Sequence, residues 1–312
     1  MIDDNKLLKI INKKITESEL NDEEKERLVK LKKYRKILTT LKKMPLVKQR
    51  SKEWHELRKN RLTASDLADA IANNNKAIIK KKAGLYHDNS NICYKNLKPL
   101  VWGTMFEPMA TRCYSQKNND IIVNEFGLIP DKKLKHFGAS PDGITELGIM
   151  IEIKCPISRK IIDGEIPEKY YMQIQGQLAV CNLEECDYVE CGFKIFDSKE
   201  EYLADEQEQE FEKINHGVIA EFKDDDNNLE YEYSDAYLTK EEAISNIELK
   251  VLRANSNLKF SKYNYWKLLQ INIQKVYFNE KQWNENIVPK INDFWTKVES
   301  HRKRGPFIED SD

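Results

Sequence analysis

The sequence of 312 residues has no excess of either charge, no closely paired cysteines and no long hydrophobic run. Its 51 Lys and Arg residues and 52 Asp and Glu residues give a formal net charge of -1. Any nucleic-acid site must therefore come from local basic clusters, because no global field attracts a polyanion. No apolar stretch is long enough for a signal peptide or a membrane span. We predict a soluble, intracellular protein of the cytoplasm or nucleus, without a membrane partner.

The cysteines also exclude several classes of protein. The six lie at positions 93, 113, 155, 181, 186 and 191, without the short paired spacing of zinc or haem motifs. The even spacing of Cys181, Cys186 and Cys191 does not match ferredoxin-like patterns. Since Cys155 and Cys191 fall on apolar strand faces, we expect core thiols in a reducing compartment.

The most informative stretch is residues 137–156, which reads FGASPDGITELGIMIEIKCP. Its second half alternates as a strand does, with four apolar residues on one face: Ile149, Ile151, Ile153 and Cys155. The other face carries Met150, Glu152 and Lys154. Pro141 stiffens the chain before Asp142 and Gly143 lets it turn, so a tight hairpin brings Asp142 beside Glu152.

This pairing predicts a metal site. Two carboxylates on adjacent strands form a hard, oxygen-rich site suited to Mg²⁺ or Mn²⁺, and the neighbouring Lys154 can orient or activate a water. By itself, Glu152-x-Lys154 is equally typical of an exposed cross-strand ion pair.

A second cluster precedes the hairpin in the sequence. Trp54, Leu57 and Arg58 share a helix face, and Thr63 or Ser65 then caps a new helix. A helix N-terminus beside an arginine makes a phosphate pocket, although these residues by themselves favour an ordinary cap and a surface arginine. Residues 76–82 contain four lysines that fit either a DNA-backbone contact or a solvated helix face.

Two further segments carry polar residues beside apolar helix faces. One helix is predicted to begin close to Thr104, because Pro108 belongs near a first turn, and Glu107 lies at its margin. A strand over 121–127 is expected to follow it. Another opens at Pro167, and there Gln173 and Gln177 lie one turn apart.

Together these segments resemble the PD-(D/E)XK nucleases, and more narrowly their lambda-exonuclease/YqaJ-type viral recombinase branch. Between residues 49 and 191 the motifs run in order as Trp-x-x-Leu-Arg, Thr-Ala-Ser, Trp-Gly-x-x-x-Glu, Ser-Pro-Asp-Gly, Glu-x-Lys-Cys-Pro and Tyr-x-x-Gln-x-Gln. Each is a modest signal, but six in the right order are hard to obtain by chance. They cover somewhat under half of the chain.

The resemblance implies a Mg²⁺-dependent (or Mn²⁺-dependent) exonuclease acting 5′→3′ on double-stranded DNA ends, in recombination, repair or viral DNA processing. Asp142, Glu152 and the Ile153 carbonyl would bind the metal, with Glu107 assisting through water. Lys154 would position or deprotonate the attacking water, and Gln173 would help to orient it. The same likeness assigns the 5′-phosphate and DNA contacts to Arg58, Thr63, Ser65 and Gln175.

The resemblance also implies a restriction-endonuclease-like α/β (α+β) core with a mixed central sheet flanked by helices. We predict an N-terminal helical extension over residues 1–44 and a nuclease domain over 45–312. Two apolar stripes that include Ile15 build the extension, and the run Asn21-Asp22-Glu23-Glu24 between them is a helix start. The motif-bearing core would span 49–196. Over 197–312 we expect acidic solvated insertions at 198–228, a strand from Trp266 to Phe278 at the sheet's edge and a C-terminal helix.

Two other functions fit the same motifs. The fold also supports endonucleases of the restriction or alkaline-nuclease type, and a degenerate site would leave a non-catalytic protein that binds DNA ends. Family habit implies a single-strand annealing recombinase as partner and allows a homo-trimeric ring. The Lys-, Asn- and Ile-rich composition suits an AT-rich, viral genome.

Overall fold

The structure of the protein, a computed structural model, describes residues 3–12, 20–45, 47, 49–84, 98–206, 214–255 and 257–304. The predictions for Ile15, for Cys93 and for the acidic residues Glu208 and Glu210 lie outside these residues. None of the described helices is both long and apolar enough to cross a membrane.

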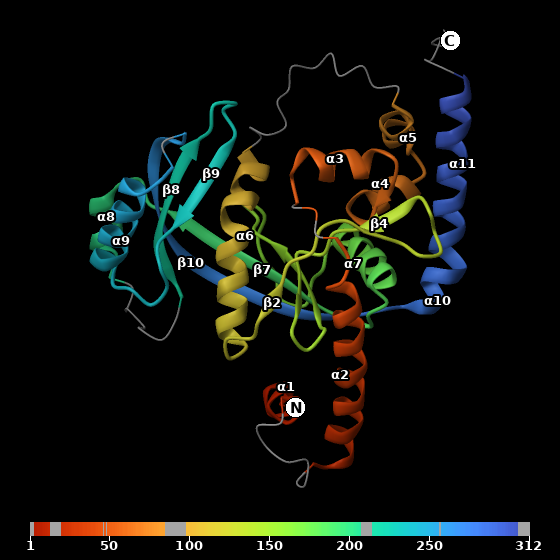
Figure 1. Cartoon of the computed structure of the whole chain (residues 1–312), viewed down its shortest axis with the longest axis horizontal. Coiled ribbons are helices and arrows are strands. Elements are labelled where there is room, and N and C mark those ends of the chain that lie inside the picture. Colours follow the sequence, from red (N-terminus) through yellow and green to blue (C-terminus); the bar gives the residue numbers. More distant parts are fainter. Residues whose placement is uncertain are drawn as a thin grey trace.

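A seven-stranded mixed sheet forms the centre of the molecule (Figure 1). Its order is β2-β5-β6-β7-β10-β8-β9, and only the β6–β7 pair is parallel among these described strands. The strands are β2 (Val123–Asn124), β5 (Gly143–Thr145), β6 (Met150–Lys154), β7 (Glu185–Ile195), β8 (His216–Lys223), β9 (Leu229–Tyr233) and β10 (Lys259–Tyr277). A parallel pair needs a crossover, which helix α7 (Glu168–Cys181) supplies. The predicted mixed sheet flanked by helices is confirmed.

A smaller sheet connects the N-terminal part of the domain to the central hairpin. Its order is β1 (Leu62–Thr63), β4 (Phe137–Ala139) and β3 (Ile129–Pro130). Strands β1 and β4 are parallel, with Thr63 opposite Gly138. This pairing places the segment around Thr63 beside the chain that leads into Asp142.

Helices cover both faces of the large sheet. Besides α7, the described helices are α1 (Asp4–Ile11), α2 (Asp22–Leu41), α3 (Lys52–Lys59), α4 (Leu67–Ile71), α5 (Lys76–Ala83), α6 (Lys98–Lys117), α8 (Lys199–Ala204), α9 (Lys240–Leu252), α10 (Glu280–Gln282) and α11 (Val288–Arg304), with a 3₁₀ turn at Ala64–Asp66 and a π-helical turn at Trp283–Ile287. Helix α6 reaches one face, where Tyr114 donates to Asp187 Oδ2 at 2.7 Å. Helix α7 reaches the other, where it contacts Glu152. Strand β6 is therefore buried on both sides.

Helix α2 supports the turn of the central hairpin. It begins with a capping box between Asn21 and Glu24, at the predicted start. Tyr34 packs against Gly148, which joins β5 to β6 with φ +82°, and a Cβ at that glycine would lie 2.6 Å from Tyr34 Cβ. The Tyr34 hydroxyl lies 3.1 Å from Glu185 Oε1 in β7. The N-terminal helices thus share the core of the sheet.

Four of the cysteines are buried core thiols, as predicted: Cys113, Cys181, Cys186 and Cys191. Burial raises the pKa of Cys113 and of Cys181 to about 12. Cys155 is only half-buried.

The prediction of solvated insertions at 198–228 was wrong. This region contains α8 and strand β8, and residues 217–222 of β8 are buried. Because β8 is covered on both faces, it lacks the polar–apolar alternation that marks a half-exposed strand. Strand β10 lies between β7 and β8 in the order of the sheet, but β8 pairs only with residues 259–267 of it. Residues 268–277 pair with β7 alone among the described strands, so most of the predicted segment from Trp266 to Phe278 does lie at an edge.

Two boundaries before the hairpin also differ from the prediction. Helix α6 begins at Lys98 and contains Pro108 in its interior. An interior proline removes one backbone hydrogen bond, and the burial of Phe106 and Met109 on either side offsets this cost by packing. The strand expected over 121–127 is only Val123–Asn124.

Candidate metal and phosphate site

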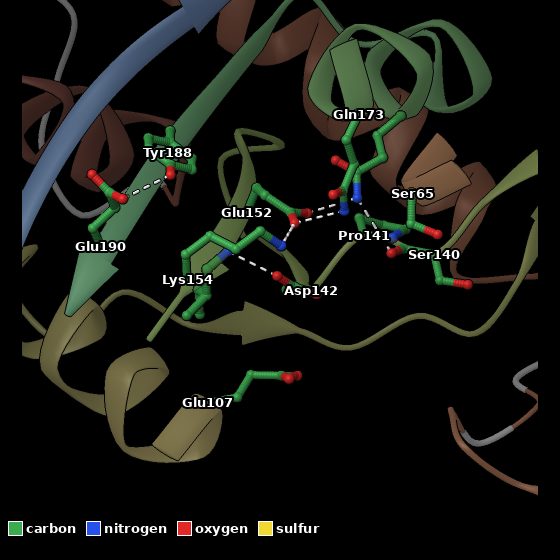
Figure 2. Close-up of polar contacts among 12 residues, drawn as sticks. Ser65, Glu107, Ser140, Pro141, Asp142, Glu152, Lys154, Gln173, Tyr188 and Glu190 are labelled. Carbon is green, nitrogen blue, oxygen red and sulfur yellow. Dashed lines mark hydrogen bonds and ion pairs between the residues drawn. The ribbon is translucent and has the colours of Figure 1, made fainter. Parts of the chain in front are cut away.

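The β5–β6 hairpin brings the three predicted catalytic side chains together (Figure 2). Asp142 immediately precedes β5, and its Oδ2 accepts a hydrogen bond of 2.7 Å from the backbone N–H of Ile153. Glu152 and Lys154 lie on the same face of β6, where the ammonium donates to Glu152 Oε1. The convergence expected from the sequence is present in the fold.

Helix α7 holds the Glu152 carboxylate from above. Gln173 Nε2 donates to Oε1 at 2.6 Å and Gln177 Nε2 donates to Oε2 at 2.7 Å. Because the glutamines are four residues apart, both amides point from one helix face into the sheet. Glu152 is fully buried, so these donors and Lys154 offset the cost of an interior charge.

Gln177 is a site residue to which sequence analysis assigned no role. The signal was present in its one-turn spacing from Gln173, but the motif Tyr-x-x-Gln-x-Gln directed attention to Gln175 instead. Only the fold shows which of the later glutamines faces Glu152.

The DNA-contacting role predicted for Gln175 is contradicted by its position. Gln175 is fully buried and lies on the side of α7 opposite to Gln173. Its Nε2 donates to the Tyr277 carbonyl at 3.0 Å, and its Oε1 accepts from the Asn279 N–H at 2.8 Å. Both ends of the amide are used to attach α7 to the end of β10.

The electrostatics of the cluster favour a cation. Burial and the charges of Glu152 and Glu107 raise the pKa of Asp142 well above its ordinary value. Burial alone would lower the pKa of Lys154, but the charges of Glu152 and Asp142 hold it above its ordinary value. A divalent ion beside the two carboxylates would offset their repulsion.

The donor set fits a hard metal ion that keeps several non-protein ligands. Within the described ranges, no three His, Cys, Asp or Glu side chains converge closely enough to hold an ion by themselves. Asp142 and Glu152 could supply carboxylate oxygens and Ile153 a carbonyl. Water and phosphate oxygens would complete the coordination, as is usual for Mg²⁺.

Glu107 lies apart from this cluster (Figure 2). It projects from α6 and accepts a 2.5 Å hydrogen bond from Arg50 Nη2. Its charge still acts on Asp142. A contribution through water therefore stays a prediction.

Arg58, Thr63 and Ser65 form a second cluster, as the sequence predicted. Arg58 Nη2 donates to Thr63 Oγ1 at 3.0 Å and to Ser65 Oγ at 2.9 Å. The guanidinium also lies 4.1 Å from the centroid of the Trp54 ring. These contacts fix the arginine in a rigid fork that suits a phosphate.

The capping role predicted for Thr63 or Ser65 was wrong. Thr63 precedes the 3₁₀ turn but makes no side-chain cap, and α4 begins after Asp66, also without one. The two hydroxyls contact Arg58 instead. The candidate phosphate site is therefore a cluster of side chains and not a free helix N-terminus.

Lys82 supports this cluster from beneath, which contradicts its assignment to a solvated or DNA-contacting face. Its side chain is buried, and Nζ lies 3.0 Å from Asp66 Oδ2. Asp66 Oδ2 in turn accepts a 3.2 Å hydrogen bond from Thr63 Oγ1. Burial would raise the pKa of Asp66, but the charges of Lys82 and Lys81 hold it below its ordinary value.

The C-terminal helix adds positive charge next to the same cluster. Arg302 Nη2 donates to the Lys82 carbonyl at 2.7 Å and lies 3.3 Å from Asn60 Oδ1. The end of α11 therefore meets α3 and α5, although these segments are far apart in the sequence. We use the term basic surface for the exposed cations Lys81, Arg302, Lys303 and Arg304.

The chain is similar in sequence to known proteins. Residues 53–184 match the model of the YqaJ-like viral recombinase domain, which confirms the resemblance predicted from the motifs. An uncharacterized protein of Acanthamoeba polyphaga mimivirus is 28% identical over 315 residues, covering 87% of this chain and 56% of that protein. A protein of African swine fever virus is 27% identical over 180 residues, covering 47% of this chain and 50% of that protein. The chain spans about half the length of these curated relatives.

A solved structure is also similar. The alkaline exonuclease LHK-Exo from Laribacter hongkongensis superposes with a TM-score of 0.48 and 19% sequence identity. The similarity covers 81% of this chain and 95% of that chain.

Proposed function

We propose that this chain, whose residues 53–184 match the YqaJ-like viral recombinase domain, is a divalent-metal-dependent DNA nuclease that degrades duplex DNA from its 5′ ends. The convergence of Asp142, Glu152 and Lys154 on one hairpin carries this proposal. A protein that only bound DNA would gain nothing from buried carboxylates, because they repel a polyanion.

The residues divide the work between binding and water activation. Asp142, Glu152 and the Ile153 carbonyl would hold the metal, which lowers the pKa of a bound water and offsets charge on the phosphorane. Lys154 would orient the attacking water against the scissile phosphate. Gln173 and Gln177 would fix Glu152, so that its oxygens keep one orientation through the reaction.

Arg58 and Ser65, which the buried Thr63 holds through its hydroxyl, support the preference for a 5′ end. A terminal phosphate bound by these side chains would fix the distance along the DNA strand from its 5′ end to the scissile bond beside Asp142. The basic surface lies next to this pocket and would contact further phosphates of the duplex. An annealing recombinase and a trimeric assembly are extensions of this proposal that follow from the family resemblance.

A test compares linear duplexes labelled at one end, with and without a 5′-phosphate, in Mg²⁺ and in EDTA. We expect Mg²⁺-dependent release of nucleotides from phosphorylated 5′ ends and no cleavage of closed circular DNA. Equal rates with and without the phosphate would remove the pocket assignment. Nicking of the circle would instead identify an endonuclease, and the absence of cleavage would refute the nuclease.

A further inference from the structure

A buried acidic side chain, Glu190, lies beside the candidate metal site and is neither a proposed metal ligand nor a proposed water-activating group. Glu190 in β7 is the parallel neighbour of Lys154 in β6, so both side chains leave the same face of the sheet (Figure 2). Glu190 is fully buried. Its Oε1 accepts a 2.8 Å hydrogen bond from the Tyr188 hydroxyl and also contacts Arg159 Nη2. Its Oε2 has no hydrogen-bond donor among the described residues.

Arg159 is held by this carboxylate but faces outward. It lies in the segment between β6 and α7, and its side chain is 38% exposed. Its other hydrogen bond runs from Nη1 to the Lys160 carbonyl at 3.3 Å. A guanidinium has five N–H donors, so several of them find no acceptor in the described part of the chain.

A structural ion pair in the same strand looks different. Arg27 pairs with Glu185 of β7, but its side chain is only 12% exposed, and Nε and Nη2 donate to the two carboxylate oxygens of Asp4. All three nitrogens of the Arg27 guanidinium therefore donate to carboxylates of the protein. The Arg159–Glu190 pair instead joins one buried partner to one accessible partner with donors to spare.

The ring of Tyr170 places Arg159 next to the candidate site. Lys154 Nζ lies 4.9 Å from the ring centroid, and Arg159 Cζ lies 5.8 Å from the same centroid. Lys154, the proposed water-orienting amine, and Arg159 therefore place two positive charges next to each other at one aromatic ring. A DNA strand with its scissile phosphate at Lys154 would bring a neighbouring phosphate to Arg159.

We propose that Arg159 binds the phosphate next to the scissile one, and that Glu190, oriented by Tyr188, is the positioning residue that holds the guanidinium there. The inference rests on the proposed nuclease function and deepens it. The planar fork of arginine suits a phosphate, and the buried Glu190 fixes one edge of the fork so that the others face the strand.

The first experiment compares Arg159→Ala, Arg159→Lys and a control, Arg112→Ala. Arg112 is matched because it is exposed and its Cζ also lies 5.8 Å from a tyrosine ring centroid, that of Tyr233. On a 5′-phosphorylated duplex in Mg²⁺, Arg159→Ala should raise KM about 10-fold to 100-fold, the effect expected for one charge-assisted hydrogen bond. Arg159→Lys should recover part of this effect, and Arg112→Ala should match the wild type.

The second experiment identifies the phosphate with substrates that carry one neutral methylphosphonate near the scissile bond. At the contacted position the substitution should weaken wild-type binding, measured as Kd in Ca²⁺, by the same factor as Arg159→Ala. It should have no further effect on that variant. A merely structural arginine would leave the sensitivity to methylphosphonate unchanged at every position, and that result would overturn the proposal.

Glu190→Gln tests the positioning role, since the amide preserves shape but not charge. It should raise KM less than Arg159→Ala does, and it should add nothing in the Arg159→Ala background. Additive effects would refute the coupling.

The outcomes also separate this proposal from the proposed nuclease function. If the wild type cleaves DNA and Arg159→Ala has the same KM and Kd as the wild type, Arg159 does not bind the phosphate, and the nuclease function is unaffected. If the wild type does not cleave, the nuclease fails, and the Kd comparison still decides the phosphate contact.

Discussion

The indole Nε1 of Trp54 donates a hydrogen bond of 3.1 Å to Ser140 Oγ. Trp54 also lies under the guanidinium of Arg58, and Ser140 stands two residues before Asp142. One side chain therefore joins the candidate phosphate pocket to the loop that carries a candidate metal ligand. Gln177 strengthens the same junction through a 3.4 Å contact to the Ser140 carbonyl.

Trp54→Phe should weaken this connection without removing the ring beneath Arg58. We expect the preference for 5′-phosphorylated over 5′-hydroxyl ends to fall about 5-fold, the value of one hydrogen bond of about 1 kcal/mol. The measurement is the ratio of cleavage rates on the two ends. Trp102→Phe is the control, because the indole N–H of Trp102 has no partner among the described residues. Equal ratios for both variants would show that the junction is passive.

Asp142→Asn should abolish cleavage and at the same time leave the metal-free protein as stable as the wild type, or more so. The asparagine Oδ1 can still accept from Ile153, while the burial of a charge and its repulsion by Glu152, which together raise the pKa of Asp142, are both removed. In thermal unfolding, Mg²⁺ should raise the Tm of the wild type but not that of the variant. A variant that keeps the Mg²⁺-dependent rise would exclude Asp142 as a ligand.

Gln177→Ala and Gln175→Ala should fail in opposite ways, although the residues are two positions apart. Gln177→Ala removes a donor from the buried Glu152, so we expect metal affinity or kcat to fall about 10-fold to 100-fold. Gln175→Ala should leave both unchanged and lower the free energy of unfolding by about 1–3 kcal/mol, because it removes two hydrogen bonds, to Tyr277 and Asn279, each worth about 0.5–1.5 kcal/mol. Metal titration and chemical denaturation of both proteins separate the two results.

Lys82→Met should destabilise the pocket because it leaves the Asp66 charge without its buried partner. We expect the free energy of unfolding at pH 7 to fall by about 3–5 kcal/mol. The control Lys76→Met removes an exposed charge from the same helix and should change the free energy of unfolding by less than about 0.5 kcal/mol.

The same pair has a pH signature. The pKa of Asp66 is lowered in the fold, so its contribution is present above the unfolded pKa of about 3.9 and is lost as pH falls through the folded value. Lys82→Met should therefore unfold with less dependence on pH below about 4 than the wild type. An identical acid transition would contradict this assignment.

The basic surface should govern the salt dependence of DNA binding. Replacing Lys81, Lys303 and Arg304 by alanine should lower the slope of log K against log salt by about 0.9 for each DNA phosphate that the variant no longer neutralises. The control removes the same charge at Lys36, Lys42 and Lys43, around the end of α2. Equal slopes for the two triple variants would mean that only net charge matters.

The sequence alone determined the local parts of this protein. Alternating residues defined β6, the Asn21 capping box defined the start of α2, and the order of short motifs identified the hairpin with Asp142 and Glu152. Each of these signals acts over a few residues, where backbone geometry and side-chain periodicity leave little choice. For the same reason, the sequence predicted the cluster of Arg58, Thr63 and Ser65 correctly, whereas the predicted helix cap is not formed.

Only the tertiary structure decided the contacts between distant segments. Whether Gln175 or Gln177 faces Glu152 depends on the rotation of α7 over the sheet, and the burial of Lys82 depends on its approach to Asp66. Strand β8 escaped detection because burial on both faces erases alternation. The meeting of Arg302 with α5 and of Arg159 with Glu190 arises from packing across the domain, which no local pattern encodes.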